Sequence, residues 1–247
     1  MKYFSIFFLL LIQFSHGQGA FERANKMYKE GQYQDAIEVY QSIIKSKKHS
    51  ADLYFNLANC YYKLNRVAPA IYNFEKALLL NPNDTDIQNN LRFAQKLQID
   101  DIKDNPKVGF QNMLQDFTSK YHYDTWAWIS VCFAILFLLL FIGYFYAKNS
   151  VIKRMFFTAM ILVLILILIS VAAAVFEKNN FKSNRPAIVF AEITSVKTEP
   201  KSNAPDSFTL HEGSKVYVLE TLDDWRKIEL SDGKKGWIPA IYIKEIK

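Results

Sequence analysis

The stretches that decide the fold are two apolar runs, WAWISVCFAILFLLLFIGYFYA at residues 126–147 and MFFTAMILVLILILISVAAAVF at residues 155–176. Neither run contains a charged side chain. A helix rises about 1.5 Å per residue, so each run as a helix spans roughly 30 Å, the thickness of the hydrocarbon layer of a bilayer. The alternative, a helix buried in a large globular domain, would carry a polar stripe. The sequence therefore predicts a hairpin of two transmembrane helices.

Charge and the first residues of the chain predict the orientation of this hairpin. Residues 148–154, between the two runs, contain Lys148, Lys153 and Arg154 and no anion. Short loops rich in Lys and Arg stay in the cytoplasm. Residues 1–17 begin with Lys2, continue as an apolar run and end in small and polar residues, which is typical of a secretory signal peptide. An uncleaved anchor is the alternative and gives the same topology, with both remaining parts of the chain outside.

Residues 18–99 repeat themselves with a period of 34, because residues 21–40 align with residues 55–74. The aligned pairs include Ala24 with Ala58 and Ala36 with Ala70, small residues at which paired helices approach closely. Gly31 and its counterpart Asn65 both tolerate the left-handed conformation of a tight turn. This pattern resembles the tetratricopeptide repeat, which implies an α-helical array of two units. We expect a cap helix at residues 87–97, with Ile87, Leu91, Ala94 and Leu97 on its apolar face.

The resemblance implies a concave groove lined by the first helix of each repeat. Aromatic, amide and ammonium groups on one face suit an extended peptide or a partner helix; the alternative is that these residues only pack or are solvated. In repeats that grip a carboxylate, Asn25 and Asn56 match the amides, but Phe21, Asp52 and Asp86 stand where cations are wanted. The expected protein-binding residues are Phe21, Asn25, Tyr28, Lys29, Asp52, Phe55, Asn59, Tyr62 and Lys63.

One linker is expected on each side of the hairpin. Residues 100–125 contain Pro106 and Gly109, which break a helix, followed by a weakly amphipathic segment. Its apolar residues, Phe110, Met113, Leu114 and Phe117, and the aromatic residues after it are typical of a helix lying in the membrane interface. An ordinary linker is the alternative. Residues 177–186 form the second linker.

Residues 187–247 change to short β-rich runs separated by turns. Residues 216–220 alternate in polarity, and residues 231–233 read Ser-Asp-Gly, typical of a hairpin turn. The order of runs resembles a bacterial SH3-like domain, a small all-β barrel. The resemblance implies a ligand surface that includes Tyr217, Trp225 and Trp237, although residues 197–199 differ from the usual first loop.

Charge, cysteine and motif content exclude several functions. The net charge of +6 lies beside the apolar runs, since residues 18–105 hold 12 cations and 11 anions, and residues 187–247 hold 9 and 10. This distribution favours contact with membrane lipids and disfavours nucleic acid as a partner. Cys60 and Cys132 lie in different segments and predict no disulfide. The four histidines show no metal spacing, and no phosphate loop or nucleophile elbow occurs. We therefore expect no enzyme, no catalytic residues, no metal and no cofactor.

The order of these modules, from signal through repeats and hairpin to SH3-like domain, resembles the BatE proteins of the bacterial aerotolerance operon. The resemblance implies a multidomain protein of the bacterial inner membrane, two-pass, with both large domains on the periplasmic side. It also implies a scaffold role in oxidative stress, with other Bat membrane proteins that carry von Willebrand A domains as partners. The alternative is a cell-wall protein whose SH3-like domain binds peptidoglycan and whose repeats serve as a spacer.

The predicted topology is testable with reporter fusions. Fusions after Asn105 and Lys247 should report an extracytoplasmic location, and a fusion at Asn149 should report the cytoplasm. An extracytoplasmic signal at Asn149 would contradict the orientation.

Overall fold

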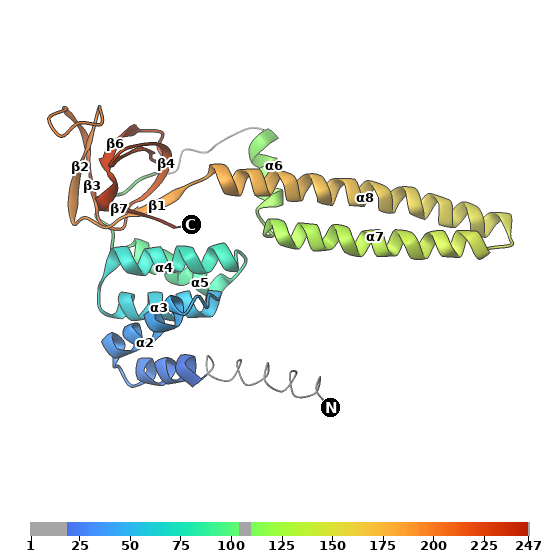
Figure 1. Ribbon diagram of the computed structural model, residues 1–247, viewed down its shortest axis with the longest axis horizontal. Coiled ribbons are helices and arrows are strands. Elements are labelled where there is room, and N and C mark those ends of the chain that lie inside the picture. Colours follow the sequence, from blue (N-terminus) through green and yellow to red (C-terminus); the bar gives the residue numbers. More distant parts are fainter. Residues whose placement is uncertain (1–18, 104–109, 247) are drawn as a thin grey trace, which may run out of the picture. The chain divides into compact units, whose positions relative to one another are not determined.

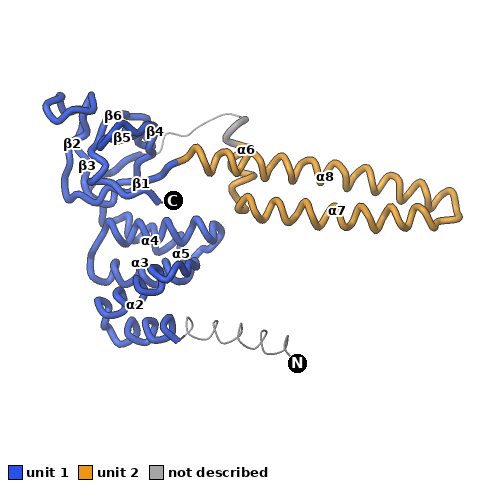
Figure 2. Tube along the Cα trace, in the orientation of Figure 1, with its two compact units in different colours: residues 1–105, 185–247 blue, residues 106–184 orange. Residues whose placement is uncertain are grey.

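The computed structural model describes residues 19–103 and 110–246, with side chains from residue 113 onward in the second range (Figure 1). The signal peptide predicted at residues 1–17 lies outside the described residues. The chain divides into two compact units (Figure 2). The first combines residues 1–105 with residues 185–247, and the second comprises residues 106–184.

The repeats fold as helical hairpins. A helix over residues 19–29 precedes α2 (Tyr33–Lys45), and α3 (Ala51–Lys63) precedes α4 (Val67–Leu80). Gly31 and Asn65, at the turns inside the two hairpins, have φ values of 80° and 56°, as the repeat pattern predicts. The four alanines of that pattern are completely buried. A larger side chain at these positions would separate the helices, which explains the small residues.

Side-chain caps mark where two helices of the repeat region begin. The Ser50 hydroxyl accepts a hydrogen bond from the amide of Leu53 and starts α3, and Asp84 accepts from Asp86 and Ile87 and starts α5 (Thr85–Gln95). Each cap satisfies an amide that has no partner within the helix. The cap helix was expected at residues 87–97, so its start and its end are corrected by two residues. Ile87, Leu91 and Ala94 are buried as predicted, whereas Leu97 lies beyond the helix and is exposed.

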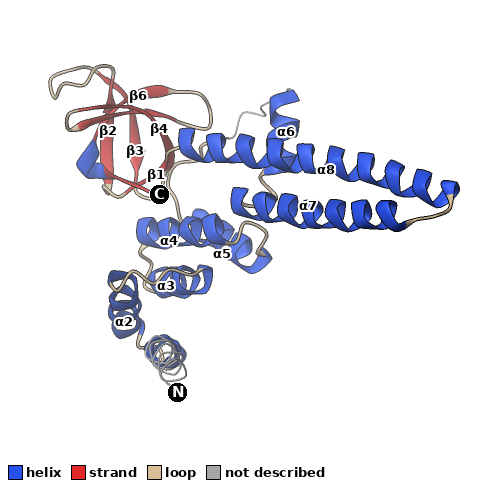
Figure 3. Ribbon diagram, turned by 45° about the vertical axis from the view of Figure 1, so that its right-hand side comes forward, coloured by secondary structure: helices blue, strands red, loops and turns tan. Residues whose placement is uncertain are grey.

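The C-terminal region forms one antiparallel sheet of seven strands in the order β3-β2-β6-β5-β4-β1-β7 (Figure 3). A short 3-10 helix, Ala240–Tyr242, precedes the last strand. The turn expected at residues 231–233 is present, with a φ value of 89° at Gly233, and Gly213 also has a positive φ of 88°. The strands are β1 (Pro186–Val189), β2 (Ile193–Lys197), β3 (Asp206–His211), β4 (Lys215–Leu222), β5 (Trp225–Glu229), β6 (Lys235–Pro239) and β7 (Ile243–Glu245).

Strand β1 belongs to two hydrophobic cores at once. Ala187 and Val189 point into the core of the sheet, whereas Ile188 points into the core of the helices. Successive side chains of a strand face opposite sides, so a strand between two apolar layers buries every residue. Ile246 joins Ile188 in the helical core, and all four side chains are fully buried. The repeats and the sheet, predicted as separate domains, therefore pack as one unit.

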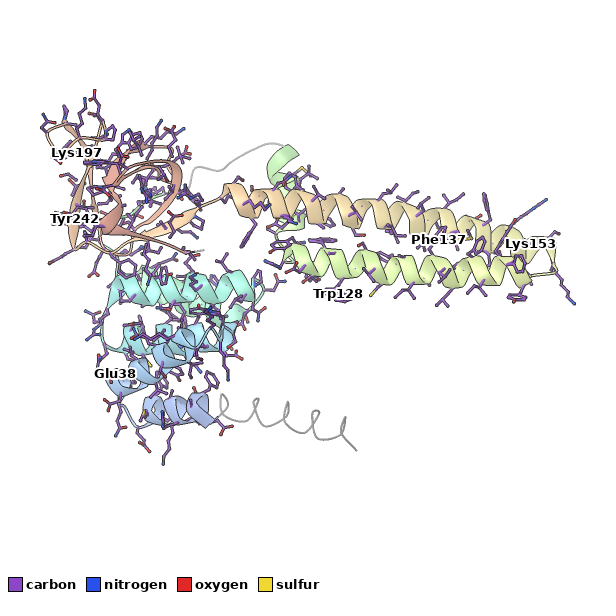
Figure 4. All side chains as sticks on the ribbon, in the orientation of Figure 1. Glu38, Trp128, Phe137, Lys153, Lys197 and Tyr242 are labelled. Carbon is purple, nitrogen blue, oxygen red and sulfur yellow. The ribbon has the colours of Figure 1, made fainter. Side chains whose placement is uncertain are left out.

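Over its described residues, from 110 to 184, the second unit contains the helices α6 (Phe110–Thr118), α7 (Tyr123–Tyr146) and α8 (Ser150–Ser183). The non-helical loop between α7 and α8 is shorter than the predicted 148–154, because the Asn149 side chain caps α8 through the amide of Val151. Lys153, labelled in Figure 4, therefore lies in the first turn of α8. Helix α8 also continues past residue 176, through part of the segment expected as a linker.

Helices α7 and α8 are long and apolar enough to cross a membrane. They pack along each other, yet most of their large apolar side chains are exposed. Trp128, for example, is 69% exposed and points away from the helix pair in Figure 4. At the base of the pair, the indole of Trp126 donates to the carbonyl of Thr118, and the Thr118 hydroxyl donates to Glu177. These bonds tie the end of α6 to α7 and α8.

Truncating Ile188 tests the shared core. Ile188→Ala should destabilise the first unit by about 2–5 kcal/mol, because it leaves a cavity between the helices and the sheet. Ile193→Ala is the matched control, since Ile193 is 63% exposed and lies in the same sheet. Chemical denaturation of the detergent-solubilised protein, followed by circular dichroism, measures both. Equal stability of the two variants would contradict a shared core.

Candidate interaction surfaces

The residues predicted to line a groove lie on the first helix and α3, with Asp52, Phe55, Asn59, Tyr62 and Lys63 on α3, and their aromatic side chains are engaged in packing. The ring centroids of Phe21 and Tyr40 lie 5.9 Å apart, as do those of Phe55 and Phe74. Tyr28 contacts Tyr33 with centroids 5.4 Å apart. All the groove aromatics, Tyr62 included, are partly buried against the helical core. The structure thus indicates that these aromatic side chains mainly stabilise the helical core.

Asn25, predicted as a ligand contact, joins the first helix to both α2 and α3. Its side-chain oxygen accepts hydrogen bonds from the hydroxyl of Tyr40 and from the amide of Asn56, the latter at 2.9 Å. Tyr40 is fully buried, and burial raises the pKa of its hydroxyl. Removing Asn25 would leave that hydroxyl without an acceptor, which typically destabilises by about 1–3 kcal/mol. The second repeat has Phe74 at the position of Tyr40, so Asn59 has no corresponding tyrosine hydroxyl.

The remaining groove residues lie on the surface. Lys29, Asp52 and Lys63 are exposed, and Asn59 is half-buried. They provide amide, ammonium and carboxylate groups beside an aromatic floor. Such a surface can hydrogen-bond an extended peptide.

The three aromatic residues predicted for the SH3-like domain share the outward face of the sheet but are not gathered at one place. Lys227 pairs across the sheet with Trp237, and its ammonium group lies 5.8 Å from the Trp237 ring and 2.8 Å from a Glu220 carboxylate oxygen. Trp225 lies two residues along from Lys227 on β5. Tyr217 lies on β4, beyond β5 from Trp237, and lines a hollow that also involves Glu75 and Asp100. A single three-residue aromatic site is therefore not formed.

A polar cluster that the sequence analysis missed joins the repeats to the sheet. We call it the seam cluster, formed by Asp100, His211 and Ser214. The Asp100 carboxylate accepts from the His211 amide at 2.7 Å, from His211 Nδ1 at 2.8 Å and from the Ser214 hydroxyl. Burial acts to raise the pKa of Asp100, but these hydrogen bonds outweigh burial and hold the pKa below its usual range. Asp100 was assigned to a linker, whereas it belongs to the first unit.

Two further contacts cross the same boundary. Lys215 forms an ion pair of 2.7 Å with Glu75 of α4, and the Gln98 side chain donates to the carbonyl of Gly213. A Cβ atom on Gly213 would lie 3.0 Å from the Val67 side chain and 3.1 Å from that of Ile71. Its positive φ favours glycine, and a Cβ atom would in addition press on these two side chains. The glycine itself is the only signal in the sequence for this close contact.

The arrangement of reactive groups offers no catalytic relay among the described residues. The Ser214 hydroxyl donates to Asp100, so His211 does not stand as a base beside it. Burial raises the pKa of Cys60 to about 12, which keeps its thiol protonated and unreactive at neutral pH. Over the part of the chain that the structure describes, no group of three His, Cys, Asp or Glu side chains is placed to hold a metal.

Comparison with known proteins identifies both modules. Residues 27–92 match the tetratricopeptide repeat family, and residues 187–246 match the variant SH3 domain family. The chain carries two interaction modules. These modules indicate protein–protein interaction as the general function, and neither is catalytic.

Similar proteins match through the repeats. The Hsp70-Hsp90 organizing protein of Triticum aestivum is 34% identical over 64 residues, which cover 26% of this chain and 11% of that protein. Sperm-associated antigen 1 of Rattus norvegicus is 32% identical over 75 residues, or 30% of this chain and 8% of that protein. The chain thus spans about a tenth of the length of these relatives.

The seam cluster predicts how stability depends on pH. The pKa of Asp100 is lower in the folded state than in the unfolded state. The carboxylate therefore stabilises the folded protein above its unfolded pKa, and this stabilisation is lost as the pH falls through the folded pKa. Asp100→Asn should destabilise the protein at pH 7 by about 1–3 kcal/mol. The variant should also lose less stability than wild type when the pH is lowered further. Asp101→Asn, at an exposed neighbour, is the control. Denaturation curves from neutral to acidic pH measure both, and parallel curves for wild type and Asp100→Asn would contradict the role of this carboxylate.

Proposed function

We propose that this protein is a non-enzymatic membrane-anchored scaffold that binds partner proteins through its repeats and its SH3-like domain together. The observation that carries the proposal is the fusion of the two modules into one unit through Ile188, Asp100 and the Lys215–Glu75 ion pair. Two recognition surfaces held in a fixed relation present a partner with one composite surface. The second contact then forms at high effective concentration.

The apolar hairpin supports membrane anchoring. The large side chains on α7 and α8 remain exposed, and lipid is the environment that would cover them favourably. The cations at Lys148, Lys153 and Arg154 favour a cytoplasmic end for the hairpin, since this is the short loop between the spans. The first unit would then lie outside the cytoplasm, in the periplasm of a bacterium with two membranes.

The proposed partners are membrane proteins with von Willebrand A domains, in a Bat-type complex linked to oxidative stress. This partner class comes from the resemblance of the module order to BatE proteins. The name of the Hsp70-Hsp90 organizing protein describes a protein that organises two others, which supports an adaptor role for repeats of this kind. Lipids beside the basic loop are further proposed contacts.

Peptidoglycan binding is the second proposal, and the sheet favours it less. It relied on Tyr217, Trp225 and Trp237 acting together, whereas β5 separates Tyr217 from Trp237. Lys227 also lies over the Trp237 ring and is paired with Glu220. Cosedimentation of the full chain with purified sacculi tests this second function directly.

Crosslinking in intact membranes tests the scaffold. Asn59→Ala with Lys63→Ala removes two accessible polar groups of the groove while keeping the packed aromatics and the Asn25–Tyr40 bond. This variant should lose crosslinks to partners with von Willebrand A domains but keep its circular dichroism spectrum. Gln34→Ala with Lys48→Ala, two exposed positions outside the groove, is the matched control. If the groove variant keeps every such crosslink, the groove is not the binding surface.

A further inference from the structure

A second concave surface lies on the repeats, away from the predicted groove. It is a hollow of about 520 Å³ between helices α2, α3 and α4 and the sheet, and we call it the seam hollow. Its volume falls within the roughly 300–1,000 Å³ range of ligand sites. None of the nine predicted groove residues lines it. Its lining residues include Gln41, Leu57, Tyr72, Asn73, Lys76, Phe190 and Lys244.

The charge of the seam hollow has one sign. Lys45, Lys76 and Lys244 line it together with His49, and its lining residues include no Asp or Glu. In the described part of the chain, none of these three lysines forms an ion pair with a carboxylate. Within the described residues, no carboxylate is therefore paired with these cations.

Two of the lysines converge on a single aromatic ring. The ammonium groups of Lys76 and Lys244 lie 5.7 Å and 4.4 Å from the centre of the Tyr72 ring, and that of Lys244 lies 5.8 Å from the Phe190 ring. Tyr72 and Phe190 pack edge to face, with centroids 5.7 Å apart. Burial and the charge of Lys244 both lower the pKa of Lys76, so the charged form of this lysine is disfavoured in the folded protein. An anion between the two ammonium groups would relieve their repulsion.

Two side-chain amides of the hollow, those of Gln41 and Asn73, offer hydrogen-bond acceptors to a ligand. The Gln41 amide nitrogen donates to the Tyr61 hydroxyl, and the Asn73 amide nitrogen donates to the carbonyl of Pro69. The carbonyl oxygen of each side chain is the acceptor end of its amide. A peptide backbone supplies N–H donors for such oxygens, whereas a phosphate or a simple anion supplies none. Ile44 and Phe190, which are only partly buried, add an apolar surface on which a hydrophobic side chain can pack.

We propose that the seam hollow binds a short acidic peptide segment of a partner protein, with a carboxylate between Lys76 and Lys244. The carboxylate comes from a Glu or Asp side chain or from the end of the partner chain. An adjacent apolar side chain packs on Ile44 and Phe190, and backbone amides of the segment donate to Gln41 and Asn73. The inference rests on the proposed scaffold function and names a contact chemistry for it. Because the lining comes from both modules, the site exists only while the repeats and the sheet are packed together.

Fluorescence anisotropy with a defined peptide tests the site. The probe is fluorescein-labelled Gly-Phe-Glu-Glu with a free carboxyl terminus, titrated with the full-length protein in detergent micelles. Lys76→Gln with Lys244→Gln should weaken binding by about ten-fold or more, since charge-assisted hydrogen bonds are lost. Lys26→Gln with Lys201→Gln is the control, because it removes two exposed lysines, one from each module, and gives the same net charge. Lys244→Gln alone, at an exposed position, replaces the double variant if the latter lowers the melting temperature.

Two altered peptides identify the source of the carboxylate. One peptide has its terminal carboxyl amidated, and the other is Gly-Phe-Gln-Gln with a free carboxyl terminus. If only the amidated peptide binds more weakly, the site binds a chain terminus. If only Gly-Phe-Gln-Gln binds more weakly, the site binds acidic side chains. Equal weakening by the hollow and control variants would overturn the proposal, since attraction would then be nonspecific. Displacement of the probe by dihexanoyl phosphatidylglycerol at lower concentration than unlabelled peptide, without displacement by dihexanoyl phosphatidylcholine, would also overturn it and identify a lipid headgroup as the occupant.

The peptide-binding test of the seam hollow and the crosslinking test of the scaffold function can fail independently. If the hollow variants bind the probe like wild type while the groove variant loses its crosslinked partners, the hollow is overturned and the scaffold function stands. If the hollow variants lose the probe while the groove variant keeps its partners, the hollow is supported and the groove is excluded.

Discussion

The first unit depends on the burial of one isoleucine from a strand in the core of a helical array. Ile188 lies among the helices while its neighbours Ala187 and Val189 lie in the sheet, so β1 is covered on both faces. Burial of an isoleucine contributes about 1.5–3 kcal/mol, and the strand cannot shift by one residue without exchanging the two cores. The register of β1 with β4 and β7 therefore also fixes how the repeats meet the sheet.

Polar contacts between the repeats and the sheet fix the orientation in which the two modules pack. Asp100 satisfies the His211 amide, the His211 ring and the Ser214 hydroxyl, so groups that would lie buried without partners are all bonded. Apolar contact alone would allow the modules to rotate against each other. Directional bonds to a single carboxylate restrict that rotation, and the composite surface and the seam hollow both depend on this restriction.

The sequence predicted each module but not their union, for identifiable reasons. The alignment of residues 21–40 with residues 55–74 correctly predicted the buried alanines and the left-handed Gly31 and Asn65. The alternation of β1 could not be read, because Ala-Ile-Val is apolar at every position. The alignment also paired Tyr40 with Phe74, which suggested an apolar role for both rings. The hydrogen bond from the Tyr40 hydroxyl to Asn25 was therefore not predicted. Lys45, Lys76 and Lys244 are too far apart in the sequence for any pattern to predict that they line one hollow.

The order of the chain has a consequence for biogenesis. The apolar hairpin is inserted between Asp100 and its partners, with 111 residues separating Asp100 from His211. At about 5–20 residues per second, a ribosome needs on the order of ten seconds to make that interval. During this time the helical array has been synthesised but lacks Ile188 and Ile246, so the part of its core that they fill stays open. Nascent chains of this protein therefore pass through a stage in which this apolar surface is still uncovered and accessible to a chaperone or to a second nascent array.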